Sequence, residues 1–192
     1  MSIHGGDIQA IGGEQAAGIG GGFGGSGGQI EIAGGTVTAS GGVLGAAGIG
    51  GGNGGRGGTV VISGGSIKAM GASGAPDIGS GMNVPTSGSP TDGRGVAVSR
   101  LVVPDAANGA NAAEIEIPLA SGGTYRYFGH GHPNDFDLYF YLPAGNYAFD
   151  ACLEGVGTGS YAATLDTNPA TATIAVPFPP YIASMVAEGD EF

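Results

Sequence analysis

The sequence has 192 residues, 44 of them glycine, and its 16 acidic and 5 basic side chains give a formal net charge of −11. This balance excludes nucleic acid and anionic membranes as expected partners, because both attract basic proteins. No apolar run reaches the roughly 20 residues of a membrane-spanning helix. The single cysteine, Cys152, excludes an intramolecular disulfide. We expect its side chain to be buried and unreactive, because no basic residue stands near it in the sequence.

Glycine is concentrated at the start of the chain, since 31 of the 44 glycines lie in residues 1–81. The same short stretches recur there at an interval of 29 to 30 residues. Such a fixed period over nearly three copies predicts a repeat architecture, in which each unit stacks on its neighbours. The recurring stretches are Ala-Gly-Ile-Gly-Gly-Gly at Ala17–Gly22 and Ala47–Gly52, its altered form at Pro76–Gly81, and the pairs Gly5 and Gly6, Gly34 and Gly35, and Gly64 and Gly65.

Each repeat contains two stretches in which apolar and polar residues alternate, which is typical of half-buried strands. In the second repeat these are residues 29–32 and 36–39. We expect strands of four or five residues, separated by a sharp corner at the Gly-Gly pair. The aligned apolar positions predict inward columns, and the aligned polar positions predict outward ones. The inward columns are Ile3, Ile32 and Ile62; Ile8, Val37 and Ile67; and Ala10, Ala39 and Ala69; the outward ones are Asp7, Thr36 and Ser66; and Gln9, Thr38 and Lys68.

The stretch Gly18–Gly28 is nearly all glycine and is a flexible linker, a tightly packed polyproline-II chain or closely stacked extended backbone. We favour stacked backbone, because an isoleucine recurs within it at Ile19, Ile49 and Ile78. Hydrogen bonds between neighbouring units then offset the conformational entropy that glycine loses on folding. Residues 1–81 are therefore expected to form a parallel β-helix, or solenoid, of about three coils.

The sequence starts within a repeat, without the polar cap of a terminal repeat. We therefore expect a fragment of a longer array, whose first coil has an open edge. Open strand edges pair with other chains, so the sequence predicts a homo-oligomer or filament. The residues expected to take part are Ile3 and Ile8 of the first coil and Tyr181, Ile182, Met185 and Val186 of the tail.

The composition changes after the third repeat. Residues 82–95 are rich in Ser, Thr, Pro and Gly and are expected to form a linker. Residues 96–176 contain about seven short strands and no helical periodicity, which favours a small antiparallel β-sandwich. Residues 177–192 form a tail. The expected strands are 96–103, 114–117, 124–128, 136–142, 147–153, 160–165 and 172–176, with a hairpin connection at residues 143–146.

Two clusters of the second half are candidate sites. His130, His132, Asp135 and Asp137 carry metal-ligand chemistry, but their spacing fits an ordinary turn better than a metal site. The tyrosines form the other cluster, which offers either a platform for stacking on sugars or a border of the core. These tyrosines are Tyr125, Tyr127, Tyr139 and Tyr141.

We expect no enzyme and no cofactor, because no nucleophile has a partner and no acidic pair is spaced for acid–base catalysis. The words Ala-Gly-Ile-Gly-Gly-Gly, Gly34–Ala39 and Gly57–Gly65 resemble the glycine-rich repeats of large bacterial surface proteins. Residues 77–81 resemble the end of such an array, and Leu138–Gly145 resembles a turn of the β module that follows it.

The resemblance implies a secreted or cell-surface β-solenoid protein with a structural or adhesive role, although no signal peptide is recognisable. The alternative function is a carbohydrate-binding surface module that uses the tyrosines. No membrane insertion is expected.

Overall fold

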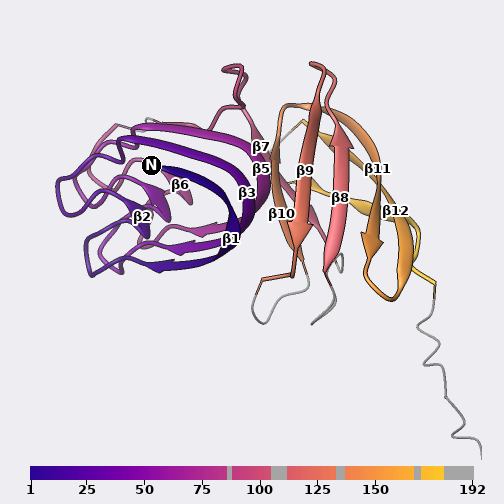
Figure 1. The fold of residues 1–192 in the computed structure, drawn as a ribbon. Helices are drawn as coiled ribbons and strands as arrows, with labels where there is room; N and C mark the ends of the chain where they lie inside the picture. Colours follow the sequence, from indigo (N-terminus) through magenta and orange to yellow (C-terminus); the bar gives the residue numbers. More distant parts are fainter. Residues whose placement is uncertain (86–87, 105–111, 133–136, 167–169, 180–192) are drawn as a thin grey trace, which may run out of the picture.

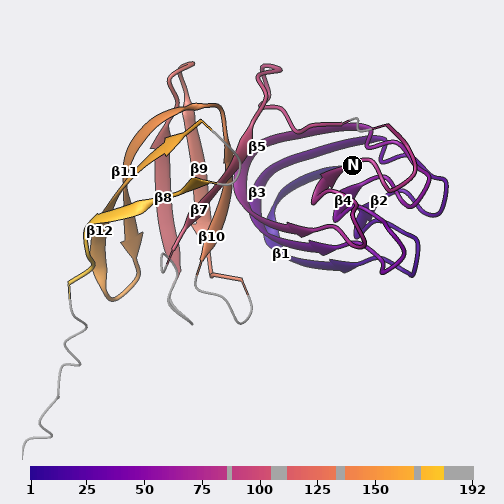
Figure 2. The same ribbon diagram turned by 180° about the vertical axis from the view of Figure 1, so that it is seen from behind.

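The computed structural model describes residues 1–85, 88–104, 112–132, 137–166 and 170–179. These residues form strands and no α-helix, so they contain no helix that could cross a membrane. The prediction of an all-β protein is confirmed. The strands lie in an eight-stranded sheet of order β1-β3-β5-β9-β8-β11-β12-β14 and two three-stranded sheets, β10-β7-β13 and β2-β4-β6. Figures 1 and 2 show two halves side by side, with the glycine-rich repeats in one and strands β7 to β14 in the other.

Three long strands run parallel in the first half and curve alongside one another (Figure 1). They are β1 (Ser2–Ile11), β3 (Gln29–Ser40) and β5 (Thr59–Met70). Their register follows the repeat, since Ile3 lies opposite Ile32 and Ile32 lies opposite Ile62. The alignment of the repeats thus predicted the pairing of all the columns. We refer to residues 1–28, 29–58 and 59–81 as repeats 1, 2 and 3.

The prediction of two short strands per repeat is wrong. Each long strand continues through its Gly-Gly pair, where the register shifts. The second glycine of each pair has a positive φ, of 89° at Gly6, 89° at Gly35 and 92° at Gly65. Glycine therefore bends the strand, as expected from its freedom at positive φ, but the bend does not interrupt hydrogen bonding beyond it.

The glycine-rich stretch is ordered and stacked, as predicted. It contains the short strands β2 (Ile19–Gly20), β4 (Ile49–Gly50) and β6 (Ile78–Gly79), which pair in parallel. Ile49 is fully buried between Ile19 and Ile78. A Cβ on Gly50 would lie 2.1 Å from the carbonyl oxygen of Gly79, and Gly50 also has a φ of 129°. Only glycine allows the backbones to approach so closely.

Two sheets form a sandwich-like second half. Strands β8 (Ala113–Pro118), β9 (Thr124–Gly129), β11 (Gly145–Leu153), β12 (Gly157–Leu165) and β14 (Thr173–Val176) belong to the large sheet. Strands β7 (Ser99–Val103), β10 (Leu138–Leu142) and β13 (Ala170–Thr171) form the other. Phe140 of β10 packs between Tyr125 and Tyr127 of β9, at ring-centroid distances of 5.6 and 5.8 Å.

Two expectations about this half are wrong. Residues 143–146 do not close a hairpin, because β10 pairs with β7 whereas β11 pairs with β8 and β12. The connection crosses from one sheet to the other, and Tyr147 donates a hydrogen bond from its hydroxyl to the carbonyl of Pro143. Cys152 is exposed, not buried. Alternation along β11 turns Tyr147, Phe149 and Ala151 inward, which places Cys152 on the outer face.

The large sheet runs from the first half into the second without a break in its strand order. β5 meets β9 in parallel, with Gly64 opposite Arg126. Thr91, within the segment expected as a linker, follows β5: its amide donates to the carbonyl of Val60, and its carbonyl accepts from the amide of Ile62. Backbone hydrogen bonds therefore tie the start of repeat 3 to the segment that leads into the second half.

The burial of Ile49 leads to the first prediction. Replacing it by aspartate places a carboxylate among fully buried apolar groups, so we expect Ile49→Asp to lower the free energy of unfolding by at least about 3 kcal/mol. The matched control is Ile11→Asp, because the Ile11 side chain is 83% exposed. Urea titration followed by circular dichroism measures both. Equal stability of the two variants would contradict the assigned core.

Candidate functional site

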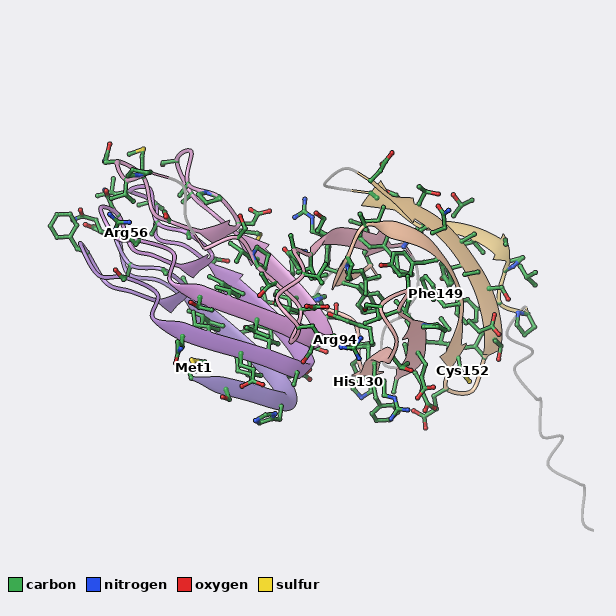
Figure 3. All side chains as sticks on the ribbon, turned by 90° about the horizontal axis from the view of Figure 1, so that it is seen from above. Met1, Arg56, Arg94, His130, Phe149 and Cys152 are labelled. Carbon is green, nitrogen blue, oxygen red and sulfur yellow. The ribbon has the colours of Figure 1, made fainter. Side chains whose placement is uncertain are left out.

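A buried polar cluster lies where the two halves meet, between β3 and β5 on one side and β9, β10 and residues 129–132 on the other. We call Thr36, Thr38, Ser66, Tyr127 and His132 the seam cluster. The alignment of the repeats predicts that Thr36, Thr38 and Ser66 lie on an outward face. That face is covered by the second half, and Thr36 and Ser66 are only 4% and 0% exposed. Figure 3 shows His130 and Arg94 near this boundary and Arg56 at the far end of the first half.

His132 joins two strands of the repeat half. Its Nδ1 lies 2.9 Å from the hydroxyl of Thr38 on β3, and its Nε2 lies 2.8 Å from the hydroxyl of Ser66 on β5. The ring is 3% exposed and meets the ring of Tyr139 edge-on, at a centroid distance of 5.4 Å. Ser66 also accepts a hydrogen bond of 3.0 Å from the amide of Tyr139 on β10. His132 of the second half therefore connects to both β3 and β5 of the repeat half.

Thr36 and Tyr127 make a second set of hydrogen bonds at the seam. Their hydroxyl oxygens lie 2.9 Å apart. Both also contact the carbonyl oxygen of His130, at 2.9 Å from Thr36 and 2.6 Å from Tyr127. Nearby, the Tyr125 hydroxyl donates to the carbonyl of Gly65, which lies at the bend of β5. The seam thus pairs its buried polar groups, which would otherwise cost free energy.

The predicted tyrosine platform is not open to sugars. Tyr125, Tyr127 and Tyr141 are 2%, 2% and 4% exposed, and Tyr139 is half-buried beside His132. The amino group of Lys68 lies 5.6 Å from the centre of the Tyr139 ring. The two pairs also lie on strands of different sheets and not on neighbouring strands. The alternative, in which tyrosines border the core, describes these residues.

The structure does not gather the candidate metal ligands. His130 is exposed whereas His132 is buried, with both ring nitrogens beside hydroxyl groups. Asp137 is half-buried, and Asp135 lies outside the described residues. Within the described part of the chain, no group of three His, Cys, Asp or Glu side chains could hold a metal ion. Both ring nitrogens of His132 are thus within hydrogen-bonding distance of a hydroxyl group, those of Thr38 and Ser66.

The contact between Ser66 and His132 has the distance of a nucleophile and its general base. Its surroundings are those of a structural contact. The serine is fully buried, and its oxygen also accepts the Tyr139 amide. A substrate carbonyl would have to replace packed backbone to reach it. The chemistry that this geometry supports is cross-strand hydrogen bonding.

Asp77 forms a second polar link between the halves. Its carboxylate accepts the amide of Gly71 at 3.1 Å and forms a 2.8 Å salt bridge with Arg100, which precedes the middle of β7. Asp77 stands where the earlier repeats have Gly18 and Gly48. The replacement of this glycine by aspartate in the third repeat is visible in the sequence. The alignment of the repeats identifies it only as an altered repeat and does not predict the contacts of Asp77 with Gly71 and Arg100.

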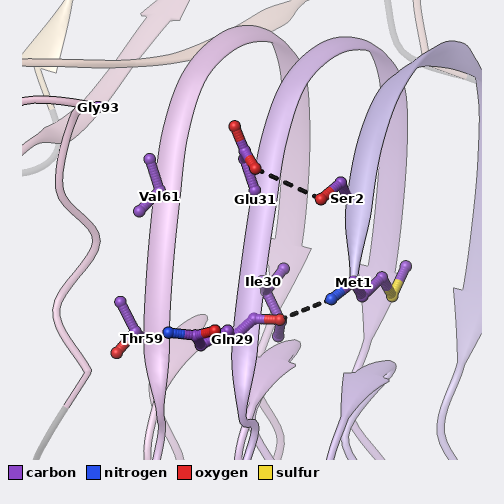
Figure 4. A pocket seen from close by; sticks show the side chains of 8 residues that line it. All are labelled: Met1, Ser2, Gln29, Ile30, Glu31, Thr59, Val61 and Gly93. Atoms are coloured by element: carbon purple, nitrogen blue, oxygen red, sulfur yellow. Dashed lines mark hydrogen bonds between the residues drawn. The ribbon is translucent and has the colours of Figure 1, made fainter.

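A shallow pocket lies on the outer face of the long strands, near the start of the chain (Figure 4). The amino group of Met1 donates to the carbonyl of Gln29 at 2.8 Å, and the hydroxyl of Ser2 donates to Glu31 at 3.3 Å. Thr59 and Val61 continue these rows on β5. One carboxylate and a few hydroxyl groups do not make a specific binding site.

The residues predicted for self-association have different surroundings. Ile3 is 5% exposed and Ile8 is half-buried, so both contribute mainly to the core. The backbone of their strand, β1, lies at the edge of the large sheet. Tyr181, Ile182, Met185 and Val186 lie outside the described residues.

Comparison with known proteins gave no match to a family model, to a curated protein or to a solved structure.

The seam cluster predicts a stability effect at Ser66. Removal of its hydroxyl leaves the His132 Nε2 and the Tyr139 amide without this buried partner, so we expect Ser66→Ala to lower the free energy of unfolding by about 2 to 4 kcal/mol. Ser63→Ala is the matched control, since Ser63 is exposed on the same strand. Urea titration measures both variants. A change below about 0.5 kcal/mol for Ser66→Ala would show that the cluster contributes little.

The buried tyrosines predict alkaline unfolding. Burial raises the pKa of Tyr127 to about 12, with the Thr36 hydrogen bond acting in the opposite direction, and burial also raises the pKa of Tyr125 and Tyr141. A folded-state pKa above the usual 10 means that stability is complete below pH 10 and decreases as the pH rises towards 12. The slope is about 1.4 kcal/mol per pH unit for each such tyrosine.

The measurement is the free energy of unfolding from urea titrations at several pH values. We expect a shallower decrease in Tyr127→Phe than in the original chain, because one late-ionising phenol is removed. The ultraviolet absorbance of tyrosinate provides a second measure of how many phenols ionise only on unfolding. An identical pH dependence in both proteins would refute the role given to Tyr127.

Proposed function

We propose that the protein is a structural element of the cell surface, in which a parallel β-solenoid is joined stiffly to a β-sandwich module. In this proposal the three repeats are successive coils, and the second half closes the last coil. The observation that carries it is the seam, where one continuous sheet and a buried polar cluster connect the two halves. Such a connection fixes the orientation of the two halves relative to each other, which a flexible linker does not.

The solenoid part of the proposal is supported by two parallel ladders that share the repeat period. Ile3 lies opposite Ile32 in the ladder of long strands, and Ile19 lies opposite Ile49 in the ladder of short strands. Side chains of both ladders are buried in one apolar cluster. A chain that returns to both ladders once in each repeat has the connectivity of a coil. Parallel crossovers of this kind are right-handed in nearly all proteins.

Closure of the array by the second half is supported by contacts along β5. Thr91 hydrogen-bonds with residues of β5, and β9 pairs with it at Gly64. The strand edge that repeat 3 would otherwise expose is thereby covered, which protects it from pairing with other chains. Asp77 adds its salt bridge to Arg100 at the same end.

The location outside the cell is supported by the resemblance of the repeat motifs to those of bacterial surface proteins. The net charge of −11 agrees with a solvent-exposed module that repels nucleic acid. An adhesive role belongs to this proposal as the attachment function of such a segment. A carbohydrate-binding role has no open tyrosine face to support it among the described residues.

Two readouts test the proposal. If the seam makes one stiff unit, both halves unfold at the same urea concentration. Tyrosine fluorescence reports on the second half, since all 7 tyrosines lie in residues 125–181. A dye attached to the thiol introduced at position 26, in a variant that combines Ser26→Cys with Cys152→Ser, reports on the first half.

The surface location predicts that antibodies against the chain label intact cells of the source.

Separate unfolding midpoints for the two probes would refute the stiff connection. Labelling of permeabilised cells alone would refute the surface location. The control for the dye is the single variant Cys152→Ser, which lacks the new thiol at position 26. Cys152 is exposed, so we expect its replacement to disturb no core contact.

A further inference from the structure

A cavity separate from the seam cluster lies where the end of repeat 3 meets the first strand of the second half. Its volume is about 320 Å³, and its walls come from residues 76–78, 89–90 and 97–100 and from Tyr141 of β10. Sites for small molecules begin at about 300 Å³. The cavity therefore has room for one small molecule.

Tyr141 differs from the other buried tyrosines in the surroundings of its hydroxyl group. Within the described part of the chain, the four other buried tyrosines each donate a hydrogen bond to a backbone carbonyl. These pairs are Tyr125 with Gly65, Tyr127 with His130, Tyr147 with Pro143, and Tyr161 with Pro104. Tyr141 is only 4% exposed, yet no hydrogen bond joins its hydroxyl to another described residue. Since a buried hydroxyl without a partner costs free energy, this group calls for a partner from outside these residues.

The Tyr141 hydroxyl lies at the charged end of the cavity. Tyr141 is paired with Arg100 of β7, whereas its neighbours Phe140 and Leu142 are fully buried in the apolar core. Burial raises the pKa of Tyr141, the charge of Arg100 lowers this pKa, and the charge of Asp77 raises it. Both charged residues line the cavity. The hydroxyl is therefore within electrostatic reach of both.

The charged groups at this end form a neutral pair. Asp77 and Arg100 are joined by a salt bridge of 2.8 Å, and the Asp77 carboxylate also accepts the amide of Gly71. A carboxylate has about four acceptor positions on its two oxygens, so these contacts leave positions for a ligand. An anion would have to compete with Asp77 for Arg100, and a cation would have to compete with Arg100 for Asp77. A neutral ligand fits this site best.

The two polar groups that face the cavity require different partners. The Tyr141 hydroxyl donates and needs an acceptor, whereas the Asp77 carboxylate only accepts and needs a donor. A hydroxyl group does both, so neighbouring hydroxyls on one molecule satisfy both residues. Most of the other lining side chains are apolar and suit C–H groups. These are Pro76, Ile78, Pro90, Ala97 and Val98.

We propose that this cavity binds one neutral sugar unit, which accepts a hydrogen bond from Tyr141 and donates one to Asp77. A sugar ring combines neighbouring hydroxyl groups with apolar C–H faces in a small neutral molecule. The inference is independent of the proposed solenoid and of the surface location. It also differs from a tyrosine stacking platform, because Tyr141 contributes its hydroxyl group and not the face of its ring.

The first measurement asks whether the Tyr141 hydroxyl has a partner within the chain. Tyr141→Phe removes an oxygen that no described residue contacts, so we expect the melting temperature to change by less than about 1 °C. Tyr127→Phe is the matched control, because its hydroxyl contacts Thr36 and His130, and we expect a decrease of about 2 to 4 °C. An equal decrease in both variants would show that Tyr141 is bonded within the chain and would overturn the inference.

The second measurement is an NMR titration of the 192-residue chain with glucose, galactose, mannose and N-acetylglucosamine. With at least one of them, we expect saturable shifts of the backbone amide signals of Asp77 and Arg100. Tyr141→Phe is expected to lower the affinity for that sugar about 3- to 10-fold, because one hydrogen bond is lost. Tyr127→Phe is expected to keep the affinity of the original chain.

Three results of this titration would overturn the inference. The first is the absence of a saturable shift with all four sugars. The second is an affinity that Tyr141→Phe leaves unchanged, since the sugar would then bind elsewhere. The third is an equal affinity for glycerol, which has neighbouring hydroxyl groups but no ring.

Discussion

Glycine backbones of neighbouring repeats approach too closely for any side chain, and this contact governs the whole structure. At Gly50 the neighbouring repeat leaves no room for a Cβ, and hydrogen bonds from Ile49 and Gly51 run to the repeat beyond. Glycine loses more conformational entropy on folding than any other residue. Backbone hydrogen bonds and the buried Ile49 column must offset that loss, and a single repeat has neither. Order in each repeat therefore requires a neighbour.

The same requirement explains the seam. The third repeat needs a cover on its outer side, and the second half supplies one through β9, Thr91 and the Asp77 to Arg100 salt bridge. Where the cover crosses the polar face of β3 and β5, buried hydroxyl groups need partners. His132 and Tyr127 provide them. The seam cluster is thus a consequence of closing a polar sheet face, and its hydrogen bonds connect the two halves.

Residues that interrupt a pattern are informative in this chain. Asp77 interrupts a glycine column at the covered end and caps a backbone amide. The outward column that contains Thr36 and Ser66 has small hydroxyl side chains where the second half packs, whereas its member in β1 is Asp7, which is exposed. Size and hydrogen-bonding capacity both matter at such positions, because a large charged group would prevent the two halves from meeting.

The repeat period, the register of the parallel ladders and the buried Ile49 column could all be predicted from the sequence, because equivalent residues must stack when units repeat. Alternation predicted most strands of the second half as well. Three features emerged only in the folded chain: β10 and β11 lie in different sheets, Cys152 faces outward, and His132 contacts Thr38 and Ser66. Local alternation specifies which faces of a strand differ, but the pairing of residues 66 positions apart depends on how the halves pack.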